Sequence, residues 1–382
     1  MAKWNYVKIG DVCTVERGGS PRPIDKFITD DPNGINWIKI GDATDSMYIT
    51  ETAQKIIPEG MKKSRYVQPG DFLLSNSMSF GRPYILKIDG CIHDGWLVLR
   101  DNGGVFDKHF LYYYLSSPST YQKFKNMAVG GVVNNLNSDM VRGVTVPIPK
   151  MEEQIEIVQT LDNVSNLIFL RKQQLQKLDD LVKARFVELF GDCKSMVSMN
   201  ELCSIITDGT HQPPRFQESG IPFIFVSNLV GNVVTYNAEK FISEDTYAEL
   251  YKRTPIEIGD LLLSTVGSYG HPAVVTEDRK FLFQRHIAYL KPRHNMVNSF
   301  YLHSALLAPD GQRQIEEKVK GIAQKTLNLS EIKKIVVPLP TIEEQNQFEK
   351  FVNQIDKSKV AVQKALDEAQ LLFDSLMQKY FG

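Results

Sequence analysis

The chain carries two copies of one long sequence pattern. The stretch VPIPKMEEQ at 146–154 returns as VPLPTIEEQ at 337–345, an offset of 191 positions. Upstream, GDFLLSNSMSFGRP at 70–83 matches GDLLLSTVGSYGHP at 259–272. Both copies end on a Phe-Gly pair. A repeat on this scale predicts that the chain folds as two related halves.

Each copy divides into a mixed segment of about 150 residues and a polar segment of about forty. In the mixed segments, short apolar strands that follow Gly-Asp turns are interspersed with helical stretches and turn-rich loops. We therefore predict an α+β fold: two globular domains of mixed sheet plus helices, separated by two long helices that form an antiparallel coiled coil with a pseudo-two-fold axis. The predicted boundaries are 1–149 and 193–340 for the globular domains, and 150–192 and 341–382 for the helices.

The two polar segments have the apolar periodicity of a coiled coil. Apolar residues recur in alternating steps of four and three, and Arg171, Arg185 and Lys359 occupy the gaps in this seam. Prolines ahead of each segment keep the chain extended, and Thr341 with Glu344 is a predicted capping box. The predicted interface residues are Ile157, Leu161, Val164, Ile168, Leu175, Leu178, Val182, Leu189, Phe348, Val352, Ile355, Val362, Leu366, Phe373, Leu376 and Tyr380.

Two related but diverged globular domains on one rigid pair of helices predict a two-site reader. Dimeric DNA-binding proteins set the spacing of their half-sites by the distance between their two reading heads. Here both heads lie in one chain, so we expect an asymmetric site with two different half-sites and an unread gap. The alternative is a protein-binding scaffold or decoy without DNA specificity of its own, and the layout alone leaves it open.

Charge and motifs argue against a catalytic role. The net charge is −1, with 18 basic against 15 acidic residues in 1–150, so the chain has no global basic surface. It has no G-x-x-x-x-G-K-[ST] loop, no N/D-P-P-Y/F methyltransferase motif and no paired His or Cys ligands, so neither a catalytic residue nor a metal site is predicted. Asp310, Glu316 and Lys318 imitate a nuclease motif, but the spacing is short, Gln312–Lys320 is predicted to be a helix, and the matching place in the first copy has no carboxylate. Scattered cysteines and the lack of a long apolar run favour a cytoplasmic protein without a membrane span.

The layout, the P-x-P-x-x-E-E-Q helix starts and the GD-φ-L-L-S…G-x-P segments together resemble the specificity subunit of type I restriction–modification systems. The resemblance covers essentially the whole chain. It implies that each globular domain is a target recognition domain for one half of a site in double-stranded DNA, and that the helices are a spacer. It also implies two methyltransferase subunits as partners, with two restriction subunits in the full complex. Those partners would bind S-adenosylmethionine, ATP and Mg²⁺, and this chain would bind no cofactor and catalyse no reaction itself.

DNA reading requires hydrogen-bonding side chains at base edges and basic groups at phosphates. We expect both on loops of the globular domains, at positions that differ between the two copies. The repeated Glu-Glu-Gln at each helix start is expected to give two identical partners equivalent docking positions. The predicted DNA-binding residues are Arg22, Lys62, Lys63, Arg65, Asn76, Arg82, Asn134, Asn135, Thr210, His211, Arg215, Ser268, His271, Arg285, Gln324 and Lys325.

Overall fold

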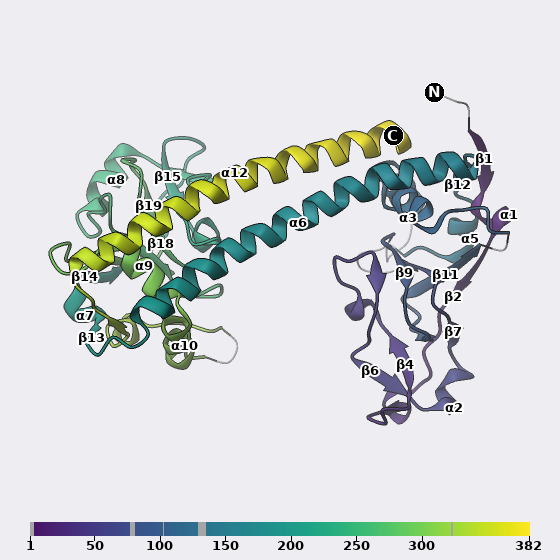
Figure 1. The fold of residues 1–382 in the computed structure, drawn as a ribbon, viewed down its shortest axis with the longest axis horizontal. Coiled ribbons are helices and arrows are strands. Elements are labelled where there is room, and N and C mark those ends of the chain that lie inside the picture. The colour runs from purple at the N-terminus through teal and green to yellow at the C-terminus, as the bar shows by residue number, and fades with distance from the viewer. Residues whose placement is uncertain (1–3, 77–80, 102, 129–134, 322–323) are drawn as a thin grey trace. The chain divides into compact units, whose positions relative to one another are not determined.

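The computed structural model describes residues 4–76, 81–101, 103–128, 135–321 and 324–382. Its contacts divide the chain into two compact units. Unit 1 comprises residues 1–170 with 366–382, and unit 2 comprises residues 171–365. Each unit therefore combines one globular part with one stretch of each long helix (Figure 1).

Unit 1 contains three sheets, with strand orders β1-β12, β2-β11-β8-β9-β5 and β3-β6-β4-β10-β7. The strands are β1 (Asn5–Lys8), β2 (Cys13–Arg17), β3 (Ile28–Thr29), β4 (Ile35–Ile38), β5 (Tyr48–Ile49), β6 (Gln54–Ile56), β7 (Arg65–Val67), β8 (Phe72–Ser75), β9 (Pro83–Leu86), β10 (Gly90–Ile92), β11 (Trp96–Asp101) and β12 (Thr145–Ile148). The helices before α6 are α1 (Ile9–Val12), α2 (Pro58–Met61), α3 (Lys108–Ser116), α4 (Pro118–Ala128) and α5 (Ser138–Arg142), with short 3-10 turns at Ile24–Lys26 and Ile40–Asp42.

Unit 2 has the sheets β13-β21, β14-β20-β17-β18 and β16-β15-β19. Its strands are β13 (Met196–Ser198), β14 (Cys203–Asp208), β15 (Ile221–Ile224), β16 (Lys240–Ile242), β17 (Leu261–Ser264), β18 (Pro272–Val274), β19 (Leu282–Phe283), β20 (Ile287–Pro292) and β21 (Val336–Pro338). Its short helices are α7 (Met199–Leu202), α8 (Glu244–Tyr251), α9 (Ser299–Leu307), α10 (Pro309–Lys318) and α11 (Leu329–Ile332), with a 3-10 turn at Val226–Leu229.

The two units repeat one topology, which confirms the predicted α+β duplication. The antiparallel order β2-β11-β8-β9 of unit 1 returns as β14-β20-β17-β18 in unit 2. The smaller sheets correspond as well, because β4 pairs antiparallel with β6 and parallel with β10, as β15 does with β16 and β19. The strands that follow the Gly-Asp turns, β8 and β17, are buried throughout, which explains why three apolar residues precede the serine that ends each strand.

A β-bulge explains why the spacing between the copies changes along the chain. Cys13 lies opposite Asp101, and Cys203 lies opposite Pro292, so the cysteines match at an offset of 190. The pairing of β14 with β20 then shifts between Cys203 and Ile205, which leaves Ser204 as an extra residue. From that point β2 and β14, and β11 and β20, match at 191, the offset of the opening motif, whereas β8 and β17 match at 189.

A buried glutamine ties the start of α6 (Met151–Phe190) to the globular part of unit 1. Gln154 is 0% exposed. Its Oε1 accepts a hydrogen bond from the backbone N–H of Asp107 at 2.8 Å, and its Nε2 donates to the carbonyls of Val105 at 3.0 Å and Pro149 at 3.1 Å. Asp107 is the N-cap of α3 and accepts from two backbone N–H groups of that helix. One side chain thus joins the loop before α3 to the loop before α6.

Unit 2 repeats this joint atom for atom at α12 (Ile342–Phe381). Gln345 is 0% exposed, accepts from the N–H of Asn298 at 2.8 Å, and donates to Met296 at 3.2 Å and Pro340 at 3.0 Å. The Glu-Glu-Gln motif was expected to present matching docking positions, and for its glutamines this interpretation is wrong, because both side chains are buried. The predicted capping box is present, with Glu344 N–H donating to Thr341 Oγ1 and Thr341 N–H donating to the Glu344 carboxylate.

The two long helices are confirmed, and they lie side by side in each unit (Figure 1). In unit 1 the start of α6, including Ile157 and Leu161, shares a core with the end of α12, including Phe373 and Phe381. In unit 2 the end of α6 shares a core with the start of α12, where Phe348 lies. Within each unit the helices therefore run antiparallel.

The predicted seam fails at one residue. Leu189 is 46% exposed, whereas Phe186 and Phe190 are buried. Both phenylalanines contact the rings of Tyr301 and Phe348. At this end α6 packs against the globular core as well as against α12, so the buried face advances in steps of four and leaves the three-four alternation. Lys359 fills its predicted gap, with Nζ 2.6 Å from the Asp179 carboxylate on α6 and 3.2 Å from that of Asp356.

Candidate nucleic-acid interface

Four chain segments of unit 1 meet where its central strands end. The backbone N–H of Gly18 donates to Trp96 O at 2.9 Å, and that of Gly19 donates to Ile92 O at 3.2 Å. The N–H of Asn76 donates to Gly95 O at 2.9 Å, and that of Leu136 donates to Asn76 O at 3.0 Å. We call this meeting point, formed by residues 17–23, 76, 92–96 and 135–136, the loop junction of unit 1.

Unit 2 makes the same four bonds. Gly209 N–H donates to Ile287 O at 3.1 Å, Thr210 N–H to Phe283 O at 3.0 Å, Thr265 N–H to His286 O at 2.9 Å, and Leu327 N–H to Thr265 O at 2.8 Å. The loop junction of unit 2 therefore comprises residues 208–211, 265, 283–287 and 324–327.

The first glycine of each junction is required by close packing. A Cβ at Gly18 would lie 2.2 Å from His93 O, and one at Gly209 would lie 2.3 Å from Phe283 O. Only a residue without a side chain lets the two backbones approach this closely. The shared glycine and the four shared bonds establish which positions of the two junctions are equivalent.

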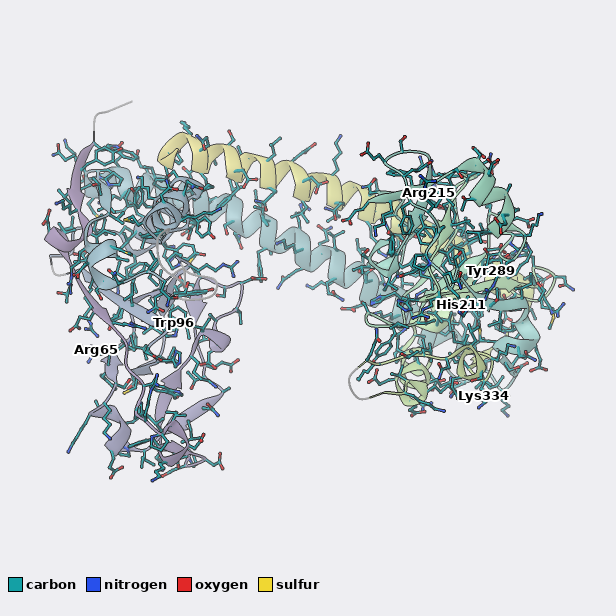
Figure 2. All side chains as sticks on the ribbon, turned by 180° about the vertical axis from the view of Figure 1, so that it is seen from behind. Arg65, Trp96, His211, Arg215, Tyr289 and Lys334 are labelled. Carbon is teal, nitrogen blue, oxygen red and sulfur yellow. The ribbon has the colours of Figure 1, made fainter. Side chains whose placement is uncertain are left out.

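Several predicted DNA-binding residues come together at or beside the junction of unit 1. Arg22 is on its first loop, with an 82% exposed side chain. Lys62 and Lys63 are exposed and lie next to it, since Ser64 Oγ donates to Ile92 O at 2.9 Å. Arg65 lies at the edge of the unit, 3.2 Å from the Glu16 carboxylate (Figure 2). Asn135 is exposed beside Leu136. These five remain predicted DNA contacts.

The prediction for Asn76 is wrong. Its side chain is 1% exposed, and its Nδ2 donates to the backbone carbonyl of Asp94 at 2.9 Å. Asn76 is buried because the loops converge over it, so it holds the junction together instead of reaching DNA. Arg82 lies beside the junction, where its backbone bonds Ser75, and it lines a hollow of about 360 Å³ together with Tyr84 and Tyr112. Asn134 lies outside the described residues.

In unit 2, Thr210, His211, Arg285 and Gln324 belong to the loop junction. Lys325 is adjacent, where its Nζ lies 2.9 Å from the Glu316 carboxylate. That pairing also occupies one acid of the nuclease-like pattern, and the other, Asp310, is paired with Arg313.

Three further predicted residues lie around this junction. Arg215 lines a hollow of about 540 Å³ together with His211 of the junction (both are labelled in Figure 2). Ser268 is exposed, and His271 is half-buried with its Nδ1 3.1 Å from Asn232 Oδ1. All three stay predictions.

The sequence argument did not identify Asp94, which lies at the centre of the junction of unit 1. Its Oδ1 accepts from Ser20 Oγ at 2.7 Å and lies 3.0 Å from His93 Nε2. Burial alone would raise the pKa of the carboxyl, but the Ser20 hydrogen bond and the charges of His93 and Arg17 outweigh it, so the pKa lies below its ordinary value. Asp94 is therefore an ionised carboxylate held among basic groups.

The matching centre of unit 2 carries Arg285 beside His286. Burial, and then the charge of Arg285, lower the pKa of His286, so the imidazole is neutral at pH 7. Arg285 Nε lies 3.4 Å from His286 Nε2, within reach of a weak hydrogen bond. The cleft at this point has a volume of about 260 Å³ and is lined by Asp208, Thr265 and Arg285.

The described residues form neither a metal site nor a membrane-spanning helix. Across the described ranges, no three His, Cys, Asp or Glu side chains are grouped to hold a metal ion. No helix in the same part of the chain is long and apolar enough to span a membrane.

Comparison with known proteins gives one consistent answer. The family model described as type I restriction modification DNA specificity domain matches residues 1–180 and 195–369. The EcoBI specificity subunit of Escherichia coli is 25% identical over 386 residues, which cover 91% of this chain and 80% of the relative. The MjaIX specificity subunit of Methanocaldococcus jannaschii is 24% identical over 404 residues, which cover 96% of this chain and 91% of the relative.

Two solved structures share the fold. A chain from a study of complex assembly in a type I R-M system aligns with a TM-score of 0.59 at 20% identity, covering 100% of this chain and 98% of the other. The S subunit from M. genitalium aligns with a TM-score of 0.51 at 15% identity, covering 100% and 96%. Because the family model matches two tandem segments that span most of the sequence, the chain belongs to the family of type I restriction–modification DNA specificity domains.

Proposed function

We propose that each unit reads one half of an asymmetric bipartite DNA site, with its loop junction as the reading surface. One observation carries this proposal: the two junctions share a backbone frame bond for bond, while the side chains that they present differ. A duplicated frame with different side chains is what a protein needs to read two unlike half-sites. Membership of the DNA-specificity family favours this function over a scaffold without DNA specificity.

The basic side chains beside the junctions would supply the phosphate contacts. Arg22, Lys62 and Lys63 in unit 1, and Arg215 in unit 2, are exposed at the margins of their junctions. Phosphate contacts of this kind position a protein on DNA without reading its sequence. Since the whole chain is nearly neutral, we expect the isolated protein to bind DNA weakly, with further affinity coming from basic surfaces of its partners.

The long helices would hold the two units at a fixed spacing and seat the catalytic partners. Specificity subunits act together with methyltransferase and restriction subunits. We propose two methyltransferases here because the exposed Glu152 and Glu343 occupy equivalent positions at the starts of the two long helices. The chain itself would perform no chemistry and would act in the cytoplasm, where its DNA target lies. S-adenosylmethionine, ATP and Mg²⁺ would be bound by the partners.

The test is to co-express the chain with a methyltransferase partner and to map the methylated adenines by sequencing. A motif of two blocks separated by an unread gap is expected. Replacing residues 1–149 with the matching segment of a relative should change one block and leave the other intact, which is the internal control. Methylation at a single uninterrupted motif, or a change in both blocks, would refute the proposal.

A further inference from the structure

The two loop junctions carry opposite charges at the same two positions. Arg17 lies opposite Leu97 in the pairing of β2 with β11, and Asp208 lies opposite Ala288 in the pairing of β14 with β20. These two residues are therefore equivalent, at the offset of 191. Asp94 and Arg285 are equivalent too, because each comes directly before the residue whose carbonyl accepts from Asn76 or Thr265. At these two positions unit 1 has Arg17 and Asp94, whereas unit 2 has Asp208 and Arg285, so the charges are inverted.

In unit 1, one carboxylate oxygen of Asp94 accepts no hydrogen bond from the residues that the structure describes. Oδ1 is engaged by Ser20 and His93. Oδ2 lies 3.7 Å from Arg22 Nη2, which is an ion-pair distance but beyond a normal hydrogen bond. The side chain is 32% exposed, and Arg17 Nε donates to the Asp94 carbonyl at 3.0 Å. The surrounding cations offset the repulsion between this carboxylate and DNA phosphates.

An ionised carboxylate accepts hydrogen bonds and donates none. At a DNA base edge it therefore selects an exocyclic amino group, and in the major groove the matching partner is N4 of cytosine. Here the Ser20 hydrogen bond orients the group and leaves its second oxygen turned to a new donor.

In unit 2 the roles are reversed. The Asp208 carboxylate is already neutralised, 2.6 Å from Arg253 Nη2 and 2.9 Å from His211 Nε2. Arg285 is exposed, and among the described residues no carboxylate lies within ion-pair distance of it. Its Nε faces His286 at 3.4 Å, which leaves the two terminal nitrogens as a planar fork. Such a fork matches O6 and N7 of guanine.

We infer that Asp94 and Arg285 occupy the same base-reading position in the two units, where Asp94 selects a cytosine and Arg285 selects a guanine. The inference rests on the proposed function, because it assigns one base contact within each proposed half-site. The inference adds a carboxylate, that of Asp94, to the predicted base contacts, which were chosen without considering acidic side chains.

The test uses the full chain in complex with its methyltransferase subunits and a pool of duplexes with randomised sequence. Bound duplexes are selected and sequenced for the wild type, for Asp94→Asn and for Arg285→Gln. Asp94→Asn keeps the size of the side chain and its oxygen acceptor for Ser20, and Arg285 is exposed, so both variants are expected to fold. The matched control is Arg22→Ala, which removes a neighbouring exposed charge that we assign to phosphate.

Each reading variant should change base preference at one position of one half-site. Arg285→Gln is expected to lower the preference for guanine by about 5- to 150-fold, the effect of losing a bidentate base contact. Asp94→Asn should lower the preference for cytosine in the other half-site, because the amide nitrogen that replaces Oδ2 donates a hydrogen bond and cannot accept one from cytosine N4. Arg22→Ala should weaken binding to all selected duplexes alike.

Three results would overturn the inference. Unchanged base preferences in both variants would mean that these residues do not read DNA. Loss of preference across a whole half-site would mean that they only shape the loops. In both cases a bipartite wild-type motif would leave the proposed function intact. A wild-type complex that selects no bipartite motif would instead refute the proposed function, and the inference with it.

Discussion

Removing the Gln154 side chain tests whether the repeated motif is a structural joint. In Gln154→Ala the backbone N–H of Asp107 loses its acceptor, and the carbonyls of Val105 and Pro149 lose a donor. All three groups meet at a side chain that is 0% exposed. The change therefore leaves three backbone groups without a hydrogen-bond partner. The Asp107 carboxylate still caps α3, because it accepts hydrogen bonds from the backbone N–H groups of His109 and Phe110.

The expected cost follows from those three groups. A buried polar group that loses its partner costs about 1–3 kcal/mol. Water entering the space left by the truncated side chain will satisfy part of this demand, so we expect a local destabilisation of about 2–4 kcal/mol instead of the full sum. Since about 1.4 kcal/mol corresponds to a factor of ten, opening at the α3 joint should become at least about 30-fold more frequent.

Amide hydrogen exchange measures this opening site by site. In Gln154→Ala, exchange should accelerate at residues 107–111, whereas the equivalent amides at 298–302 keep the Gln345 joint and should be unaffected. Gln345→Ala should give the mirror result. Gln176→Ala is the control, since this exposed residue bonds only Asp180 on its own helix. Unchanged exchange at 107–111, or equal acceleration at both joints, would refute the reasoning.

Three further outcomes are expected. Lys359→Met should lower the free energy of unfolding in urea by less than about 1 kcal/mol, because the carboxylates of Asp179 and Asp356 are half-exposed and water solvates them once the lysine is removed; a loss above about 3 kcal/mol would contradict this. Lys62→Ala with Lys63→Ala should lower the slope of log Kd against log salt by about 2 without changing the motif, measured by DNA titration of the methyltransferase complex. For Asp260, burial raises the pKa of the carboxyl despite its hydrogen bond from Tyr289, so the native state takes up a proton more readily than the unfolded chain. The wild type should therefore gain stability relative to Asp260→Asn as pH falls from 7 through that raised pKa toward 3.8, and a constant difference in urea unfolding across this range would exclude the effect.

Local patterns were enough to predict the long helices and the duplicated strands. Heptad spacing located the buried face of α6 and α12 because a helix buries residues at a fixed period. The prediction failed at Leu189, where the partners are no longer only the other helix. Phe186 and Phe190 pack against Tyr301 of the globular core, and no periodicity within α6 encodes which residues of a distant segment will lie there.

The candidate interface was predicted less well, because its geometry depends on long-range contacts. Asn76 looked like a base reader by residue type, yet loops from four parts of the chain cover it. Asp94 was passed over because acidic residues were not considered as DNA contacts. An alignment of the two copies at the 191-residue offset of the opening motif would have paired Asp94 with Arg285 and revealed the inverted charge.

The duplication separates what this chain must keep from what it can change. Where the copies agree, as at Gln154 and Gln345, the shared residues make the same backbone bonds and fix each globular part to its helix. Where the frame agrees but the side chains do not, as at Asp94 and Arg285, no backbone requirement explains the difference. A position that keeps its backbone contacts while its charge inverts is free to be selected by an external partner. In a family of DNA-specificity domains, that partner is the base that each copy has to recognise.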